Sequence, residues 1–143
     1  MDGSKVRPME NNKKWDWFYV QMAAAFAAMS KDPRLQVGAV IVTHDGILYP
    51  GYNGWELGGS NVPDSLEPGM SGAVHAEANA ILKFNPTIHK NSTMYLTHNP
   101  CPVCARMIVN TQAITKVFFL NEYRDNKGIQ ILKDRGIVCE KIS

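Results

Sequence analysis

The sequence has no long hydrophobic run, little net charge and few cysteines, and each shortage excludes a class of protein. Its most apolar run, residues 20–29, is far shorter than the roughly 20 residues that a membrane-spanning helix needs. Fifteen Lys and Arg against thirteen Asp and Glu leave a net charge of +2, well short of a nucleic-acid-binding footprint. Three cysteines cannot all pair, so a disulfide framework is excluded and a reducing compartment is expected. We therefore expect neither a membrane nor a nucleic acid as partner.

What is present fits one compact domain. The chain has 143 residues, of which 45% are hydrophobic, and this is enough to bury a core. The polar first 14 residues do not resemble a signal peptide. We expect a flexible N-terminal arm over residues 1–14, a single domain over residues 15–143, and a cytoplasmic location.

The hydrophobic pattern predicts helices alternating with strands after an opening hairpin. The tight turn of that hairpin is expected at His44, Asp45 and Gly46. Helices are expected over residues 15–30, 74–84, 102–111 and 128–135, and strands over residues 36–43, 47–52, 93–97, 116–120 and 137–142. Such an order favours one central sheet with helices on both faces. In the first helix, the methionine and aromatic side chains are expected to lie in the core.

Four residues from two distant helix starts point to a metal site. Cys101 and Cys104 are spaced i, i+3, so both thiols can face one point at the start of a helix, where thiolates are stabilised. His75 would complete three protein ligands for a tetrahedral Zn²⁺, with the fourth position left to water, as in catalytic sites. Glu77, two residues from His75, could then reach that water and move its proton without being a ligand.

Simpler interpretations exist for the same residues. His75 and Glu77 could be a helix-surface pair, and the two cysteines could be a redox pair or half of a structural zinc site. A closed structural site needs a fourth ligand, for which Cys139 or His98 could be proposed. Neither has a suitable spacing to both halves, so the catalytic interpretation is favoured.

The pattern H-x-E followed by P-C-x-x-C is the signature of zinc nucleobase deaminases. From residue 15 to residue 142 the chain resembles the cytidine and deoxycytidylate deaminase superfamily, and within it the deoxycytidylate (dCMP) deaminases. The resemblance rests on the motifs "SKDPRLQVGAVIV", "GYNG", "HAEANAI", "PCPVCA" and "YRDNKGIQILKDRGI". It implies an α/β fold, a three-layer α/β/α sandwich with a central mixed five-stranded sheet. It also implies zinc-dependent hydrolysis of dCMP to dUMP and ammonia, which supplies dUMP for thymidylate synthesis.

Residue roles follow from the same resemblance. His75, Cys101 and Cys104 would hold the zinc, while Glu77 would protonate N3 of cytosine and assist the departure of ammonia. Asn53 of "GYNG" resembles the sugar-binding asparagine of the family; alternatively it is a turn residue that tolerates positive φ. The backbone N–H of Ala76 would contact the pyrimidine carbonyl.

The substrate phosphate requires cationic donors. Arg124 and Lys127 follow a strand that should end beside the zinc helices, and the matching region in the family lies near the phosphate or at subunit contacts. A solvated charged loop is the alternative. Lys31 and Arg34 of "SKDPRLQ" are further candidates.

The resemblance also extends to assembly and regulation. It implies a homohexamer, activation by dCTP and inhibition by dTTP, with Mg²⁺ accompanying a triphosphate effector. Two features depart from the family pattern. The loop before residue 75 lacks the Cys and His that hold a second zinc in several members, so one zinc per chain is expected. Trp55 and Glu56 are unusual near the position where effectors bind in relatives.

Other functions compatible with these motifs are deamination of deoxycytidine, cytidine, dCTP or adenosine in tRNA. A non-catalytic zinc-binding module is a further alternative, but it would gain nothing from Glu77.

Overall fold

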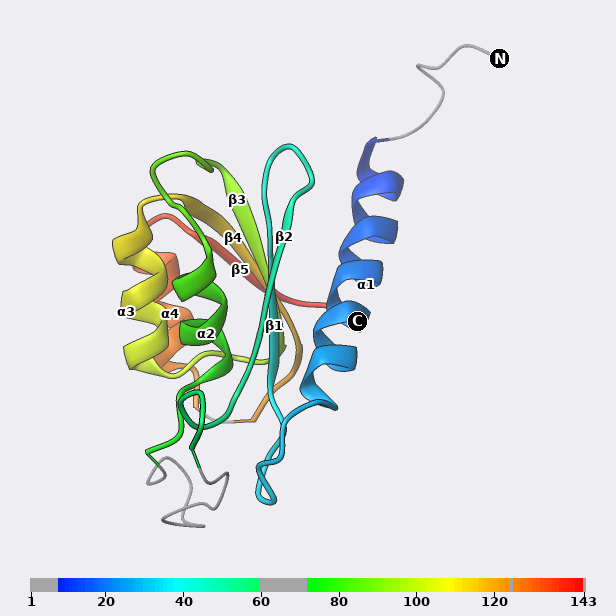
Figure 1. The fold of residues 1–143 in the computed structure, drawn as a ribbon. Helices are drawn as coiled ribbons and strands as arrows, with labels where there is room; N and C mark the ends of the chain where they lie inside the picture. The colour runs from blue at the N-terminus through cyan, green and yellow to red at the C-terminus, as the bar shows by residue number, and fades with distance from the viewer. Residues whose placement is uncertain (1–7, 60–71, 124, 143) are drawn as a thin grey trace.

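A computed structural model describes residues 8–59, 72–123 and 125–142. It contains a mixed five-stranded sheet with α1 on one face and α2, α3 and α4 on the other, which confirms the expected three-layer α/β/α sandwich (Figure 1). The order along the chain is α1 (Pro8–Ala27), β1 (Gly38–Val42), β2 (Leu48–Tyr52), α2 (Ala76–Lys83), β3 (Ser92–His98), α3 (Pro102–Thr111), β4 (Ile114–Asn121), α4 (Lys127–Asp134) and β5 (Val138–Lys141).

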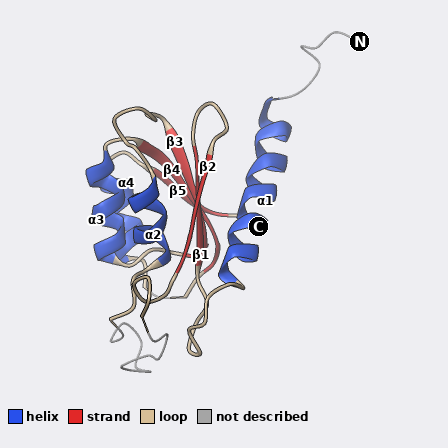
Figure 2. Ribbon diagram, in the orientation of Figure 1, coloured by secondary structure: helices blue, strands red, loops and turns tan. Residues whose placement is uncertain are grey.

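The sheet has the strand order β2-β1-β3-β4-β5 (Figure 2). β1 runs antiparallel to both β2 and β3, whereas β3, β4 and β5 are parallel. Parallel neighbours need a crossover, and α3 and α4 supply these connections on the same face.

Alternate residues of β1 face opposite sides of the sheet and build two cores. Ala39 and Ile41 belong to the cluster beneath α2, α3 and α4, while Val40 and Val42 pack with Val20, Ala23 and Tyr95 beneath α1. All five residues of β1 are buried because both faces of the strand are covered.

The first helix begins earlier than expected. The structure shows α1 from Pro8, so residues 8–14 are helical and the expected flexible arm is wrong for them; residues 1–7 lie outside the described part of the chain. Proline at the first helical position lacks only an N–H that would be unpaired there, and its fixed φ suits the helix. No Gly or further Pro interrupts residues 9–27.

The expected core role of the methionine and aromatic residues of α1 is also partly wrong. Trp15, Trp17 and Phe18 of α1, and Met29 two residues beyond its end, are between 44% and 61% exposed. Only one side of a helix can pack against a sheet. In α1 the small residues Val20, Ala23 and Ala27 lie on that side and are buried. The close fit is visible at Gly38, where an added Cβ would lie 2.7 Å from the backbone nitrogen of Ala27.

One edge of the sheet gathers the segments that carry the predicted site. β1 starts there, β2, β3 and β4 end there, and α2 and α3 begin there, at the lower end of the sheet in Figure 1. No helix within the described residues has both the length and the apolar character to cross a membrane.

Candidate metal centre

His75 immediately precedes α2 and is fixed by its neighbours on both sides. It has an extended backbone (φ −71°, ψ 153°), and its carbonyl accepts the first helical hydrogen bond, from the N–H of Asn79 at 3.0 Å. On the other side, Val74 forms an isolated β-bridge with Gly54, just beyond β2. The helix therefore starts at the sheet edge, with His75 at its first turn.

Cys101 and Cys104 lie at the first turn of α3. Cys101 is the N-cap residue, and its Sγ accepts a hydrogen bond from the N–H of Cys104 at 3.4 Å. Pro102 occupies the position where a missing N–H has no cost. Cys104 is 1% exposed, so its thiol faces inward.

The two helix starts bring these three side chains together. His75 Nδ1 lies 3.6 Å from Cys101 Sγ and 3.3 Å from Cys104 Sγ, and the ligand atoms of the three residues all lie within 4.8 Å of one another. Zn–S and Zn–N bonds of about 2.3 and 2.05 Å at tetrahedral angles separate such atoms by about 3.6 Å. The donor set, one imidazole and two thiols, and its spacing both fit Zn²⁺. Within the described residues, neither His98 nor Cys139 joins this group.

The electrostatics of the thiol pair favour a bound cation. The neighbouring Cys104 thiol, with His75 and the Cys104 N–H, holds the pKa of Cys101 down at about 3. The Cys101 side chain and burial raise the pKa of Cys104, and the charge of Glu77 adds to this effect. The protein alone thus accommodates one thiolate easily and a second only with a compensating positive charge, which a metal supplies.

Glu77 lies in the first turn of α2 and is 5% exposed. Its carboxylate acts on the Cys104 thiol through both charge and a hydrogen bond, so it lies beside the donor group. It is not a member of that group among the described residues. This is the placement that a proton-transferring residue next to a metal requires.

Asn53 is buried just beyond β2, and its amide holds the α1–β1 loop. Oδ1 accepts from the N–H of Val37 at 2.8 Å, while Nδ2 donates to the carbonyl of Leu35 at 2.8 Å and to Asp32 at 3.3 Å. Asn53 does not have a positive φ, so the alternative of a left-handed turn residue does not apply. The remaining hydrogen-bonding capacity of its side chain is the second lone pair of Oδ1.

Sequence reasoning missed two further residues, Ser30 and Asp32, that hold the α1–β1 loop together with Asn53. Ser30 donates to the carbonyl of Asn53 at 2.8 Å, and its hydroxyl accepts the N–H of Asp32. Asp32 in turn accepts the N–H groups of Arg34 and Leu35. The signal was the Ser-x-Asp sequence between a helix and a strand, since both residue types bond the backbone in turns.

The remaining predicted site residues are Ala76, Lys127 and Arg124. Ala76 is the first residue of α2 and is fully buried. Lys127 is exposed at the first position of α4, and Asp125 accepts its backbone N–H. Arg124 lies outside the described residues.

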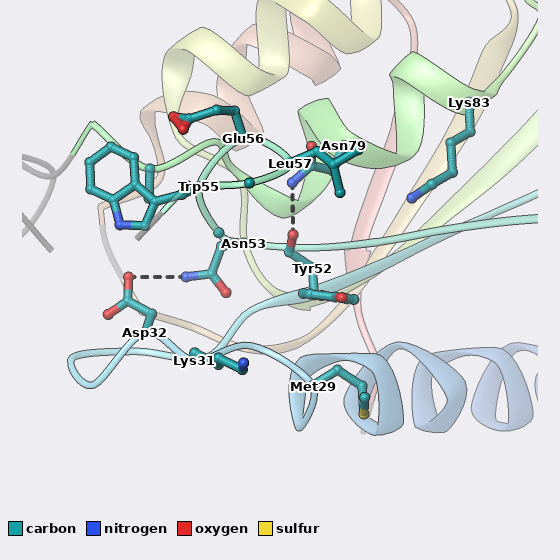
Figure 3. A pocket seen from close by; sticks show the side chains of 14 residues that line it. Met29, Lys31, Asp32, Tyr52, Asn53, Trp55, Glu56, Leu57, Asn79 and Lys83 are labelled. Carbon is teal, nitrogen blue, oxygen red and sulfur yellow. Dashed lines mark hydrogen bonds between the residues drawn. The ribbon is translucent and has the colours of Figure 1, made fainter. Parts of the chain in front are cut away.

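A pocket of about 480 Å³ (Figure 3) is lined in part by Ala73, two residues before His75. It lies between the end of α1, the segment after β2 and the exposed side of α2. Its polar lining includes Lys31, Asp32, Asn53, Glu56 and Asn79. None of His75, Glu77, Cys101 and Cys104 lines it, so the pocket does not contain the candidate metal centre.

Comparisons with known proteins agree with this arrangement. Residues 13–121 match the family described as "Cytidine and deoxycytidylate deaminase zinc-binding region". The chain is 40% identical over 128 residues to an uncharacterized deaminase in the luxG 3′ region of Aliivibrio fischeri, covering 85% of this chain and 86% of that one. It is 33% identical over 122 residues to human deoxycytidylate deaminase, covering 79% and 68% respectively.

A solved structure is similar over nearly the whole chain. The dCMP deaminase of cyanophage S-TIM5, in complex with dCMP and dUMP, superposes with a TM-score of 0.77 at 32% identity. The similarity covers 95% of this chain and 98% of the phage protein.

Proposed function

This chain belongs to the cytidine and deoxycytidylate deaminase family, and from that membership we propose that it is a zinc-dependent hydrolase converting dCMP to dUMP and ammonia. The observation that carries the proposal is the buried carboxylate of Glu77 beside three metal donors, to which residues 8–59, 72–123 and 125–142 add no fourth. The choice of dCMP is supported by the phage deaminase whose structure contains dCMP and dUMP.

His75, Cys101 and Cys104 would hold the zinc. When bound, the ion lowers the pKa of a coordinated water to about 7, which makes a nucleophile available at neutral pH. Glu77 takes a proton from the attacking water and delivers it to N3 of cytosine as the C4–O bond forms. It then transfers the second proton to the amino group, so that the C4–N bond breaks and ammonia leaves.

The surrounding residues would orient the nucleotide. The backbone N–H of Ala76, at the start of α2, is free of helical hydrogen bonding and would donate to the pyrimidine carbonyl. Asn53 would offer the free lone pair of Oδ1 to a sugar hydroxyl, and Arg124 and Lys127 would attract the 5′-phosphate.

We propose a homohexamer in the cytoplasm for the assembly. Self-association is supported by the exposed aromatic side chains of Trp15, Trp17 and Phe18 on α1, which would gain from being covered. Light scattering of the purified protein would measure the subunit number.

We propose regulation by dCTP and dTTP, with Mg²⁺ bound to the triphosphate. The pocket lined by Trp55 and Glu56 has the volume for a nucleotide, which supports an effector there. Turnover of dCMP with and without each triphosphate tests the response.

The function is tested by measuring ammonia release from dCMP, deoxycytidine, cytidine, dCTP and adenosine in tRNA. We expect dCMP to have the highest kcat/KM, and Cys104→Ala to abolish turnover together with zinc binding. A higher kcat/KM for one of the other four compounds would mean that this compound, and not dCMP, is the substrate. If zinc-loaded protein turns over none of the five, the chain is better explained as a non-catalytic zinc module.

A further inference from the structure

We propose that Asn99 is a positioning residue for the metal centre: its side chain fixes the segment between β4 and α4, and α4 in turn holds Cys101 where it can bind zinc. The inference rests on the zinc of the proposed function and deepens it by naming what positions one of the ligands. Asn99 lies two residues before Cys101, and nothing in the spacing of the metal donors singles it out.

Asn99 is an amide buried at the sheet edge where the metal donors lie. It follows β3 directly and is 2% exposed. Its backbone N–H donates to the carbonyl of Asn121, the last residue of β4, at 3.2 Å. Its Oδ1 accepts the N–H of Tyr123 at 2.8 Å, and its Nδ2 donates to the carbonyl of Asp125 at 3.1 Å. One residue thus bonds to three alternate residues where the chain leaves β4.

The side-chain amide continues the sheet where the main chain cannot. β3 and β4 are parallel neighbours, paired as far as His98 and Asn121. Pro100 has no N–H, so the backbone of this segment cannot donate the next bond of the ladder. A primary amide carries an acceptor and a donor, as a peptide unit does, so it can make both bonds. The side chain of Asn99 therefore holds the segment after β4 to the end of β3.

The segment held by Asn99 leads into α4, whose first turn packs on the metal-binding segment. Asp125 Oδ1 accepts the N–H of the first residue of α4 at 3.0 Å. A Cβ added to Gly128 would lie 3.1 Å from the carbonyl carbon of Cys101 and closer still to the carbonyl oxygen of Pro100. The contact leaves no room for a side chain, so the place of α4 fixes the backbone at Cys101. α3 and α4 lie side by side on one face of the sheet (Figure 1).

The position of Cys101 decides the geometry of the whole donor group. Its Sγ accepts the N–H of Cys104, so one turn of α3 places the two thiols relative to each other. The third donor, His75, comes from another helix, and its Nδ1 lies 3.6 Å from Cys101 Sγ and 3.3 Å from Cys104 Sγ. A tetrahedral zinc site needs such distances to be kept. A shift of Cys101 relative to His75 would therefore weaken zinc binding.

The test measures zinc affinity, by competition with a chromogenic chelator, for wild type, Asn99→Leu and Asn99→Ala. Leucine keeps the volume of the side chain and removes the amide, so it separates the loss of hydrogen bonds from the opening of a cavity. We expect the Kd for zinc to rise roughly 10- to 100-fold in both variants, the usual effect of losing a residue that orients a metal ligand. Co²⁺ gives a second readout, because its visible spectrum depends on ligand geometry. At saturating Co²⁺ the tetrahedral bands of the wild type should weaken or shift in both variants.

Two controls separate positioning from a general loss of stability. Val20→Ala opens the core beneath α1, on the other face of the sheet, and should lower stability without changing the zinc Kd or the Co²⁺ spectrum. Asn121→Ala removes an amide from the same edge. Its Nδ2 bonds to the carbonyl of Thr97 at 3.1 Å, which joins β4 to β3 and not to the segment before α4, so this variant should also leave both readouts unchanged.

Zinc and the bonds of Asn99 must also stabilise each other in the wild type, because coupling between two sites is reciprocal. Zinc should slow hydrogen exchange at the N–H of Tyr123 more than at the N–H of Ile47. The Ile47 N–H is likewise bonded to a side-chain oxygen, Thr43 Oγ1 at 2.8 Å, but in the hairpin at the opposite edge of the sheet. Global unfolding would affect both amides, so the difference between them is the measure. This comparison needs no variant and stays decisive if the Asn99 variants do not fold.

An unchanged zinc Kd in folded Asn99→Leu, or equal slowing of the two amides by zinc, would overturn the role of Asn99 while leaving the dCMP activity of the wild type in place. A wild type that binds zinc but is inactive on dCMP would overturn the proposed function and not this assignment. A wild type that binds no zinc would overturn both.

Discussion

At the scale of single residues, Glu77 combines burial with a position beside two acidic thiols. An ionisable group with 5% exposure is expensive to bury unless it is paired. Glu77 lies beside thiols that are themselves acidic, and its charge makes Cys104 harder to ionise. A divalent cation held by the neighbouring donors would offset the repulsion between this carboxylate and the thiols, which agrees with the proposed proton-transfer role.

The role of Glu77 can be separated from metal binding. In Glu77→Gln the shape is kept and no metal ligand is lost, so zinc content should stay at the wild-type level. Turnover of dCMP should fall by roughly 10²- to 10⁴-fold, the usual contribution of a general acid–base group. Zinc analysis and steady-state kinetics on the same preparation measure both quantities.

Glu140→Gln is the matched control, because Glu140 is exposed on β5 and should change neither zinc nor turnover. Near-normal turnover of a zinc-replete Glu77→Gln protein would contradict the proton-transfer role.

The buried thiol of Cys139 should make the free energy of unfolding depend on pH. Cys139 is 2% exposed, and burial raises the pKa of its thiol to about 11 from an ordinary 9.0. The folded protein therefore binds the proton more tightly than the unfolded chain, so the contribution of this thiol is full below pH 9 and is lost as pH rises towards 11. The shift corresponds to a loss of about 2–3 kcal/mol.

Chemical denaturation of reduced wild type and Cys139→Ala between pH 8 and pH 10 measures this effect. Above pH 9 the free energy of unfolding of the wild type should fall more steeply with pH than that of Cys139→Ala. The window stops at pH 10 because burial and Asp16 raise the pKa of Tyr95, which would add its own loss at higher pH. Parallel curves for the two proteins would contradict the prediction.

Sequence reasoning grouped His75, Cys101 and Cys104, which the structure brings together, because the spacing of these residues is a local pattern. Cys101 and Cys104 are one helical turn apart, and the helix starts of His75 and Cys101 both follow from local patterns. The network of Ser30, Asp32 and Asn53 joins segments up to 23 residues apart, and no local pattern specifies which backbone groups a turn residue will bond.

At the scale of elements, the backbone of α2 packs closely against β2 at Gly51. Gly51 faces the helix, and a Cβ added there would lie 2.5 Å from the backbone nitrogen of Ala80 and closer still to the carbonyl oxygen of Ala76. The contacts are backbone atoms, so the helix as a whole would have to move. Because His75 caps α2 and Glu77 lies in its first turn, the packing at Gly51 sets the position of both proposed site residues.

We expect Gly51→Ala to destabilise the protein by about 1–3 kcal/mol, the usual cost of overpacking. It should also weaken zinc retention, since α2 would be displaced from α3. Thermal unfolding and competition with a chromogenic chelator measure the two effects.

Gly54→Ala is the matched control, because an added Cβ at Gly54 meets nothing within 4 Å. Equal stability of the two variants would show that α2 is not held by this contact.

Element boundaries show where sequence patterns stop being informative. The range of α3 was predicted correctly, since proline marks its start and the end of its apolar pattern is sharp. The start of α1 was placed seven residues too late, because residues 8–14 have few apolar residues and helical propensity alone is a weak signal. The exposed aromatics of α1 were misassigned because composition does not say which stripe of a helix meets a sheet.

At the scale of the whole molecule, the metal would join two helices whose buried residues include three alanines. α2 contributes Ala76 and Ala80 to the core, and α3 contributes Ala105 and Ile108. Small side chains bury little apolar area, so this part of the core gives limited stability by itself. A cation held by His75 from one helix and two cysteines from the other would cross-link the α2 and α3 layer.

Zinc removal should therefore lower global stability as well as activity. Ligand linkage gives about 4 kcal/mol when free zinc exceeds its Kd 1,000-fold, and this corresponds to a fall in Tm of roughly 8–16 °C for a chain of this size. Elemental analysis of the purified protein should find about one zinc per chain, because the described residues offer one His/Cys/Cys group. In Cys104→Ala, chelator should leave the Tm unchanged, since this variant has already lost the cross-link. A wild-type Tm insensitive to chelation, with zinc shown to be gone, would mean that the ion acts on the substrate alone and that the two helices are held by their packing.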